Sequence, residues 1–215
     1  MASTSTRWWW VRHAPVINHD GKIYGQKDVS CDTSNSAAFS ALAAMLPGDA
    51  VWVTSHLNRT TETANAIRDA GLTAPDYIVE PDLAEQNFGD WQQKSWDQLH
   101  AEETAEYKAF WDNPGYSAPP GGESFADLQS RVTAAVGRLN AQHGGRDIIA
   151  VSHGGVIRAA VSMALETEPL KALAVTVDNL TLTRLDHIAE GIFQGQGGVW
   201  RVAGVNLPPV GTGTN

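Results

Sequence analysis

The sequence is poor in cysteine, in positive charge and in long apolar runs. Its 215 residues include one cysteine, Cys31, so no disulfide can form within the chain and nothing points to an oxidising compartment. Lysine and arginine total 15 against 24 acidic residues, and the formal net charge of −9 disfavours a general binder of nucleic acid or of anionic membranes. We see neither a membrane-spanning stretch nor a secretory signal, and therefore expect a cytoplasmic protein.

The chain also lacks internal repeats and low-complexity tracts. Hydrophobic residues make up 42% of it and charged residues 18%, a balance that argues against disorder and is ordinary for a soluble enzyme. The length is that of one domain with a sizeable core. We expect residues 1–215 to form a single domain, with residues 207–215 as a loose tail.

What the chain does contain is an alternation of strand and helix patterns. Apolar runs of the kind found in strands buried in a parallel sheet cover residues 8–12, 50–54 and 147–152. Helical patterns cover residues 36–46, 58–70, 124–141 and 156–165, and further strand-like runs cover residues 175–177, 181–185 and 199–205. This pattern predicts an α/β fold: a three-layer α/β/α sandwich around a mostly parallel sheet of about five to six strands.

Residues 83–122 interrupt the alternation. They combine five aromatic residues with turn sequences rich in proline and glycine: Trp91, Trp96, Tyr107, Phe110 and Trp111. We expect a helical insertion that covers an active site. Ser124, with Asp127 three residues later, is expected to cap the helix that follows.

Histidines stand at two of the predicted strand ends. Arg12-His13 closes the first strand, and His153 followed by Gly154 closes the third. The carboxyl ends of parallel strands are the usual place of an α/β active site. A neutral imidazole is a good nucleophile toward phosphorus, and a neighbouring guanidinium can bind two phosphate oxygens. The glycine lets a ligand approach the backbone, and the helix after it presents N–H groups to an anion.

Two further residues can complete such a site. Arg59 lies in the first turn of the helix after the second strand, facing the same crevice. Glu85 lies beside an aromatic block, where a protonated glutamic acid could supply the proton that the leaving oxygen of a phosphate ester needs. Arg158 lies a full turn into its helix, and we interpret it as structural.

Each of these strings has an ordinary structural explanation when it is taken alone. Arg12-His13 can cap a turn, Arg59 can pair with Glu62 on a helix surface, and Gly154 can belong to a tight turn between strand and helix. One of 24 acidic residues next to packing aromatics needs no catalytic role. Their joint occurrence in this order, each at a strand end or in a loop, is not explained in this way.

Together the strings resemble the histidine phosphatase superfamily, in its phosphoglycerate-mutase-like branch, from about Trp8 to Leu185. The resemblance implies a metal-independent phosphomonoesterase that acts on a small phosphorylated metabolite through a covalent phosphohistidine, without a cofactor. It implies that His13 becomes phosphorylated, that Arg12, Arg59 and His153 surround the phosphoryl group, and that Glu85 is the acid–base residue. The remaining implied phosphate or substrate contacts are Gly154, Asn18 and Gly25.

Within this superfamily the motifs at residues 24–29, 88–91 and 120–124 are most similar to α-ribazole-phosphate phosphatases, which makes α-ribazole 5′-phosphate a candidate substrate. A phosphoglycerate mutase is an alternative that would use the same site residues. The short acidic chain and an insertion with few lysines and arginines disfavour it. A non-catalytic module that binds a phospho-ligand is a second alternative, disfavoured because a binder has no use for the acid Glu85.

The chain departs from the family pattern directly after the proposed nucleophile. Ala14-Pro15 stands where a glycine is usual, and we expect activity to survive if Ala14 has a negative φ. The sequence leaves the oligomeric state open, with a homodimer as one option. The expected partner is a small phosphate ester, with no nucleic acid and no membrane.

Overall fold

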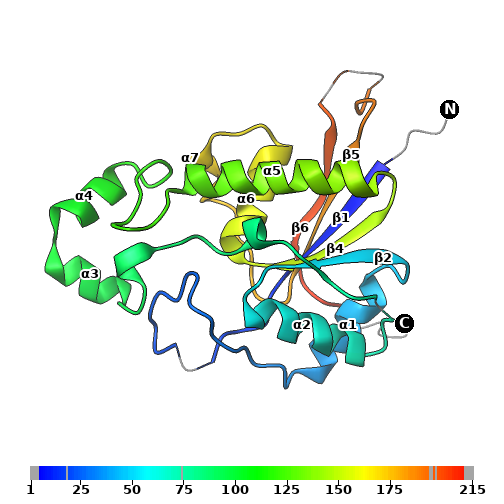
Figure 1. Ribbon diagram of the computed structural model, residues 1–215, viewed down its shortest axis with the longest axis horizontal. Coiled ribbons are helices and arrows are strands. Elements are labelled where there is room, and N and C mark those ends of the chain that lie inside the picture. Colours follow the sequence, from blue (N-terminus) through cyan, green and yellow to red (C-terminus); the bar gives the residue numbers. More distant parts are fainter. Residues whose placement is uncertain (1–4, 18, 74, 194–195, 197, 211–215) are drawn as a thin grey trace.

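The computed structural model describes residues 5–17, 19–73, 75–193, 196 and 198–210, and structural statements refer to these residues. They form one six-stranded sheet in the order β3-β2-β4-β1-β5-β6 (Figure 1). The strands are β1 (Ser5–Arg12), β2 (Ala50–Thr54), β3 (Ile78–Val79), β4 (Asp147–Ser152), β5 (Leu182–Ile188) and β6 (Trp200–Leu207). Strands β3, β2, β4 and β1 pair in parallel, and β5 pairs antiparallel with β1 and β6. The prediction of a mostly parallel sheet is confirmed.

Helices cover both faces of the sheet, as Figure 1 shows. One face carries α1 (Ser36–Met45) and α2 (Asn58–Asp69), and the other carries α5 (Phe125–His143), α6 (Gly154–Ala164) and the short α7 (Pro169–Ala172). The three-layer prediction is therefore confirmed. Ser124 caps α5: its hydroxyl accepts from the backbone N–H of Asp127, and the Asp127 carboxylate accepts from the N–H of Ser124.

The tryptophans near the start of the chain divide between the two cores, because successive side chains of a strand point to opposite faces of the sheet. Trp8 and Trp10 stack with ring centroids 4.9 Å apart and pack under α5 and α6. Trp9 packs toward α1 and α2 instead. Every residue of β2 and β4 is buried, as expected for the centre of a sheet with helices on both faces.

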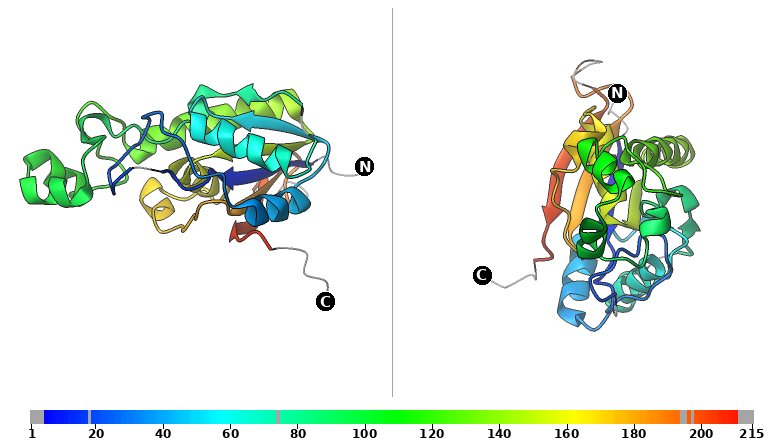
Figure 2. Two further views of the ribbon diagram at one scale, coloured as in Figure 1. Left: turned by 90° about the horizontal axis from the view of Figure 1, so that it is seen from below. Right: turned by 90° about the vertical axis from the view of Figure 1, so that its left-hand side faces the viewer.

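The insertion holds α3 (Trp96–Glu102) and α4 (Ala105–Asp112), preceded by the 3₁₀ turns η1 (Pro81–Leu83) and η2 (Gly89–Trp91). Its two helices lie beyond the end of the sheet toward which β1 points (Figure 2). Trp91, Leu99 and Phe110 form a small core there with Ile23 from the loop after β1. Among the described residues, no helix has both the length and the apolar character needed to cross a membrane.

Some predicted boundaries are wrong. Residues 175–177 form no strand, because the carbonyls of Val175 and Val177 accept from the side chains of Arg158 and Arg12 instead of from a neighbouring strand. The two-residue strand β3 was too short to predict from periodicity. Strand β6 continues to Leu207, so the predicted tail does not begin there, and residues 211–215 lie outside the described part of the chain.

Candidate active site

Three adjacent strands end at the same level and bring three loops together. The paired residues Arg12 and Ser152 close β1 and β4, and Thr54 at the end of β2 is paired with Val151. The residues that follow these ends are His13, Ser55 and His153, and all three are fully buried. The sheet therefore places both histidines of the predicted site at one edge.

The imidazole of His13 has one nitrogen engaged and one free. Nδ1 lies 2.7 Å from the carbonyl oxygen of Ala14, which can only accept, so Nδ1 carries the hydrogen. Nε2 is buried and has no hydrogen-bond partner among the described residues. Burial, and then the charge of Arg59, lowers the pKa of His13 to about 3. The ring is therefore neutral near pH 7, with a lone pair on Nε2.

Arg59 is a fully buried cation at the first turn of α2. Nη1 donates to the carbonyl of Lys27 at 2.9 Å, and Nη2 to that of Gly25 at 2.6 Å. The guanidinium also lies 5.0 Å from the centroid of the Tyr24 ring. Gly25 has a φ of +47°, a conformation that favours glycine, and its carbonyl holds Arg59 in place.

His153 uses both ring nitrogens within the protein. Nδ1 accepts from Nε of Arg59 at 3.2 Å, so the hydrogen is on Nε2, which donates to Oγ of Ser55 at 2.8 Å. Burial and the charge of Arg59 hold the pKa of His153 well below its usual range. The rings of His13 and His153 lie with centroids 5.2 Å apart. Ser55 had no predicted role, and its position directly after β2 was the signal available.

Arg12 is fixed on the other side of His13. Its Nη1 donates to the carbonyl of Val177, and its Nε is buried without a hydrogen-bond partner among the described residues. Gly154 lies against this guanidinium, since a Cβ there would stand 3.4 Å from Nε of Arg12. The predicted contact residue Gly154 is thus in place beside Arg12, and Asn18 lies outside the described residues.

Glu85 is bound to the first turn of α6. Its Oε1 and Oε2 lie 3.1 and 3.3 Å from the backbone nitrogen of Gly155, and Oε1 also accepts from the N–H of Gln86 at 3.0 Å. A helix N-terminus favours a carboxylate there. A Cβ on Gly155 would overlap Oε1 of Glu85, so this close approach requires a glycine.

The loop that carries Glu85 is fastened by Arg131, a residue that sequence reasoning missed. From α5, its Nη1 donates to the carbonyls of Asp82 and Ala84 at 2.7 and 2.8 Å, and its Nη2 to that of Glu85 at 3.0 Å. An ion pair with Glu123 at 2.7 Å holds the guanidinium. No local pattern in the sequence marks Arg131, because its partners are more than 40 residues away.

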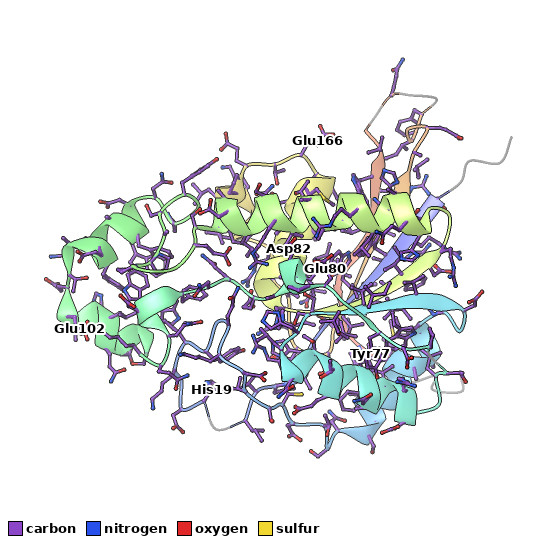
Figure 3. All side chains as sticks on the ribbon, viewed as in Figure 1. His19, Tyr77, Glu80, Asp82, Glu102 and Glu166 are labelled. Carbon is purple, nitrogen blue, oxygen red and sulfur yellow. The ribbon has the colours of Figure 1, made fainter. Side chains whose placement is uncertain are left out.

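A second arginine of α5 adds to this attachment. Figure 3 shows Glu80 and Asp82 directly under α5, where both carboxylates pair with Arg138 at 3.1 and 2.7 Å. The segment from Glu80 to Glu85 is thus tied to α5 at both its ends.

The departure at Ala14 is accommodated. Ala14 keeps a φ outside the positive region, and its methyl group is fully buried in the core under α1 and α2. Its N–H donates to Oγ1 of Thr63 at 2.9 Å, and that hydroxyl donates to the carbonyl of Arg59 at 2.7 Å. The turn after His13 is therefore linked to the helix that carries Arg59.

A pocket of about 340 Å³ opens beside Glu85. Its lining combines a few polar residues with apolar side chains, mainly from the insertion: Glu85, Gln86, Phe88, Trp96, Phe110, Trp111, Pro114, Phe125, Gly155, Arg158 and Leu173. Arg158 donates from Nε to the carbonyl of Val175 at 2.7 Å, which agrees with the structural interpretation, but it also faces this pocket. In the described part of the chain, no group of three or more histidine, cysteine or acidic residues is arranged to hold a metal ion.

The arrangement combines a neutral imidazole with a free nitrogen, two guanidinium groups and a carboxyl group at the mouth of a pocket. Such a set can bind a dianion, attack it and move a proton to or from a leaving oxygen.

Comparison with known proteins gives three curated relatives with this arrangement of motifs. The phosphoglycerate mutase-like protein 4 of Arabidopsis thaliana is 32% identical over 159 residues, which cover 72% of this chain and 69% of the relative. The metal-independent phosphoserine phosphatase of the same plant is 33% identical over 155 residues, covering 69% and 64%. The adenosylcobalamin/alpha-ribazole phosphatase of Salmonella typhimurium is 29% identical over 171 residues, covering 78% and 83%.

Solved structures share the fold over nearly the whole chain. The alpha-ribazole phosphatase from Shigella flexneri superposes with a TM-score of 0.79 at 23% identity, over 97% of this chain and 100% of that one. The mycobacterial glucosyl-3-phosphoglycerate phosphatase superposes with a TM-score of 0.76 at 26% identity, over 94% and 99%.

The family model described as "Histidine phosphatase superfamily (branch 1)" matches residues 8–195. The match spans both histidine loops, the Arg59 helix and the insertion, and the predicted type of enzyme, a phosphoric monoester hydrolase of the histidine phosphatase kind, is confirmed at the level of the family. This chain belongs to the histidine phosphatase superfamily, branch 1.

Proposed function

We propose that this protein is a metal-independent phosphomonoesterase that hydrolyses a small phosphorylated metabolite through a phosphohistidine on His13. The observation that carries the proposal is the tautomer of His13. Its Nδ1–H is engaged with the carbonyl of Ala14, which leaves the lone pair of the buried, neutral Nε2 free beside the cations Arg12 and Arg59.

In the first half-reaction, Nε2 of His13 attacks phosphorus while the bond from phosphorus to the ester oxygen breaks. Glu85, in its protonated form, gives its proton to that oxygen, and the alcohol leaves. The products of this step are phosphohistidine, the free alcohol and the Glu85 carboxylate.

In the second half-reaction, water attacks the phosphohistidine. The Glu85 carboxylate takes a proton from the water as the new oxygen–phosphorus bond forms and the nitrogen–phosphorus bond breaks. Inorganic phosphate leaves, and both His13 and Glu85 return to their starting states.

The cations supply most of the electrostatic stabilisation. Arg12 and Arg59 neutralise the phosphoryl oxygens, and their fixed carbonyl contacts mean that little reorganisation is needed during the reaction. His153 orients Arg59 through Nδ1, and its ring adjoins that of His13. Residues 83–122 act as a cap whose pocket receives the alcohol half of the substrate.

The identity of the alcohol is tested with a panel. α-Ribazole 5′-phosphate is our first candidate, since relatives by sequence and by structure are named as alpha-ribazole phosphatases. Phosphoserine and glucosyl-3-phosphoglycerate follow from the names of two further relatives. A mutase-like relative adds 3-phosphoglycerate, assayed for isomerisation as well as for phosphate release.

The mechanism is tested by trapping the intermediate. With a ³²P-labelled panel substrate quenched in base, we expect an acid-labile, base-stable phosphoenzyme in the wild type and none in His13→Asn, whose turnover falls by about 10³-fold or more. His56→Asn is the matched control, because His56 lies in the Ser55 loop but is exposed. Full turnover in His13→Asn, or a wild type that binds the panel esters without hydrolysing them, would overturn the proposal.

A further inference from the structure

The pocket beside Glu85 is apolar apart from a few groups. Aromatic side chains from the insertion and from the start of α5 form most of its walls, and Glu85 and Gly155 belong to both the pocket and the site described above. An alcohol that leaves from His13 with a proton from Glu85 therefore enters an apolar, ring-lined space.

Arg158 is the one cation in that lining. It lies three residues after Gly155 on α6 and thus on the same face of the helix as the N–H that binds Glu85. Its Nε is tied to the carbonyl of Val175, which fixes the plane of the guanidinium. In the part of the chain that the structure describes, neither Nη1 nor Nη2 has a hydrogen-bond partner, although the side chain is half-buried.

A half-buried guanidinium with its fork free, on an apolar wall, is suited to an anion. Burial lowers the pKa of Arg158, and the neighbouring carboxylate of Glu85 opposes that shift, while Arg12 adds to it. No acidic residue other than Glu85 lines the pocket, and Glu85 is already held by the backbone of Gly155 and Gln86. The anion that pairs with the fork must then come from the substrate.

We propose that the alcohol half of the substrate carries a carboxylate on an apolar or ring-bearing body, and that Arg158 binds this carboxylate and so determines specificity. The inference rests on the proposed phosphatase function, since it assigns the leaving-group end of the same site. It favours carboxylate-bearing esters over esters whose alcohol is uncharged.

The test compares three esters that share one leaving ring: phenyl phosphate, 4-carboxyphenyl phosphate and 3-carboxyphenyl phosphate. We expect the wild type to favour at least one carboxylated ester over phenyl phosphate by about tenfold in kcat/KM, mainly through a lower KM. In Arg158→Met this ratio falls to near one, and Arg158→Lys, which keeps the charge without the fork, keeps part of it. The ratio is measured within each variant, so a general loss of activity does not imitate the effect.

Arg146→Met is the matched control. Arg146 is an exposed arginine that pairs with Asp49 and precedes β4, at the opposite end of the strand from His153. It should keep the wild-type ratio, and thermal unfolding of all variants shows whether Arg158→Met remains folded.

The outcomes separate this inference from the function on which it rests. A wild type that hydrolyses all three esters with equal kcat/KM overturns the carboxylate subsite and leaves the phosphatase intact. An Arg158→Met enzyme that loses all three equally, with a moved pH–rate profile, assigns Arg158 to the support of Glu85 instead and also overturns it. A wild type that hydrolyses neither these esters nor the metabolite panel contradicts the proposed function itself.

Discussion

At the scale of single residues, the chemistry depends on which nitrogen of each buried histidine carries the hydrogen. The two rings adopt opposite tautomers: His13 is protonated on Nδ1 and His153 on Nε2. One backbone carbonyl sets the first and the side chain of Arg59 sets the second. Residue types alone could not distinguish the two roles, because both histidines end buried strands. The distinction follows from which neighbour is an acceptor and which is a donor.

Gly155 gives a prediction at this scale. Gly155→Ala places a methyl group where Oε1 of Glu85 now lies, so the carboxyl group must leave the N–H that orients it. We expect kcat to fall by at least about tenfold, with a smaller change in KM. Gly137→Ala is the control, because a methyl group at this exposed position in α5 meets nothing within 4 Å, and it should stabilise the helix slightly without affecting turnover. Equal kinetics in both variants would remove Glu85 from its assigned place.

Cys31 gives a second prediction. Burial raises the pKa of its thiol to about 11, and its Sγ lies 3.4 Å from the carbonyl of Arg59, to which it donates. We therefore expect no reaction with a disulfide reagent such as DTNB in the native state at pH 7 and one thiol per chain after unfolding in urea. Phosphatase activity should survive prolonged exposure to iodoacetamide. Rapid labelling of the native protein with loss of activity would show that the thiol is accessible and tied to turnover.

At the scale of elements, the site depends on how a loop is fastened to a helix. The segment from Glu80 to Glu85 has little secondary structure, and α5 holds it through two arginines that reach its carbonyls and carboxylates. Arg131 is nearer to Glu85 along the segment, and Glu123 fixes its orientation. Precise placement of a proton donor thus depends on contacts far from it in sequence.

The prediction at this scale compares these two arginines. Arg131→Met should lower kcat by about tenfold or more while KM changes little, because the substrate pocket remains and the acid is displaced. Arg131→Lys, which cannot reach three carbonyls and Glu123 together, should recover only part of the rate. Arg138→Met removes exposed ion pairs, which contribute little, and should stay near wild type. A common loss in KM for both methionine variants would instead indicate a general loosening of the cap.

The sequence located most elements within one or two residues, because buried strands and amphipathic helices leave strong periodic signals. The capping box at Ser124 was readable for the same reason, since its partners are three residues apart. It failed at residues 175–177, where β-branched residues favour a strand but two arginine side chains take the carbonyls. Arg131 carried no local signal at all, because its role exists only once α5 packs beside the segment that ends at Glu85.

At the scale of the whole molecule, an acidic protein concentrates cations at one edge of its sheet. The formal charge is −9, yet Arg12, Arg59 and Arg158 all lie at the carboxyl ends of the central strands or in the helices that follow. A phosphate dianion is therefore attracted locally, against the sign of the overall charge. The predictions of a single domain for residues 1–215, of a cytoplasmic location and of a homodimer as one option stay predictions.

Burial of two neutral histidines predicts how stability depends on pH. The folded state keeps His13 unprotonated down to about pH 3, whereas the unfolded chain binds a proton near 6.5, so acid favours unfolding. The stability is complete above pH 6.5 and is lost as the pH falls from there toward 3. From pH 7 to pH 5, His13 alone should cost about 2 kcal/mol, and His153 shifts in the same direction.

Urea unfolding at pH 7 and pH 5 checks this expectation. The wild type should lose free energy of unfolding on acidification, and His13→Asn should lose about 2 kcal/mol less, because asparagine does not titrate. His56→Asn, at an exposed position, should behave as the wild type does. The same slope in all three proteins would show that other groups dominate the acid response.

The short segment from Val175 to Val177 has a consequence for the choice of substrate. Its two carbonyls tether Arg158 and Arg12, one at the leaving-group end and one beside His13. Two residues of chain span at most about 7 Å, so the anchors of these cations cannot drift far apart. The enzyme then works as a caliper: it selects molecules by the separation between their phosphate and a second negative group, and a change in the length of this segment would alter the size of metabolite that it accepts.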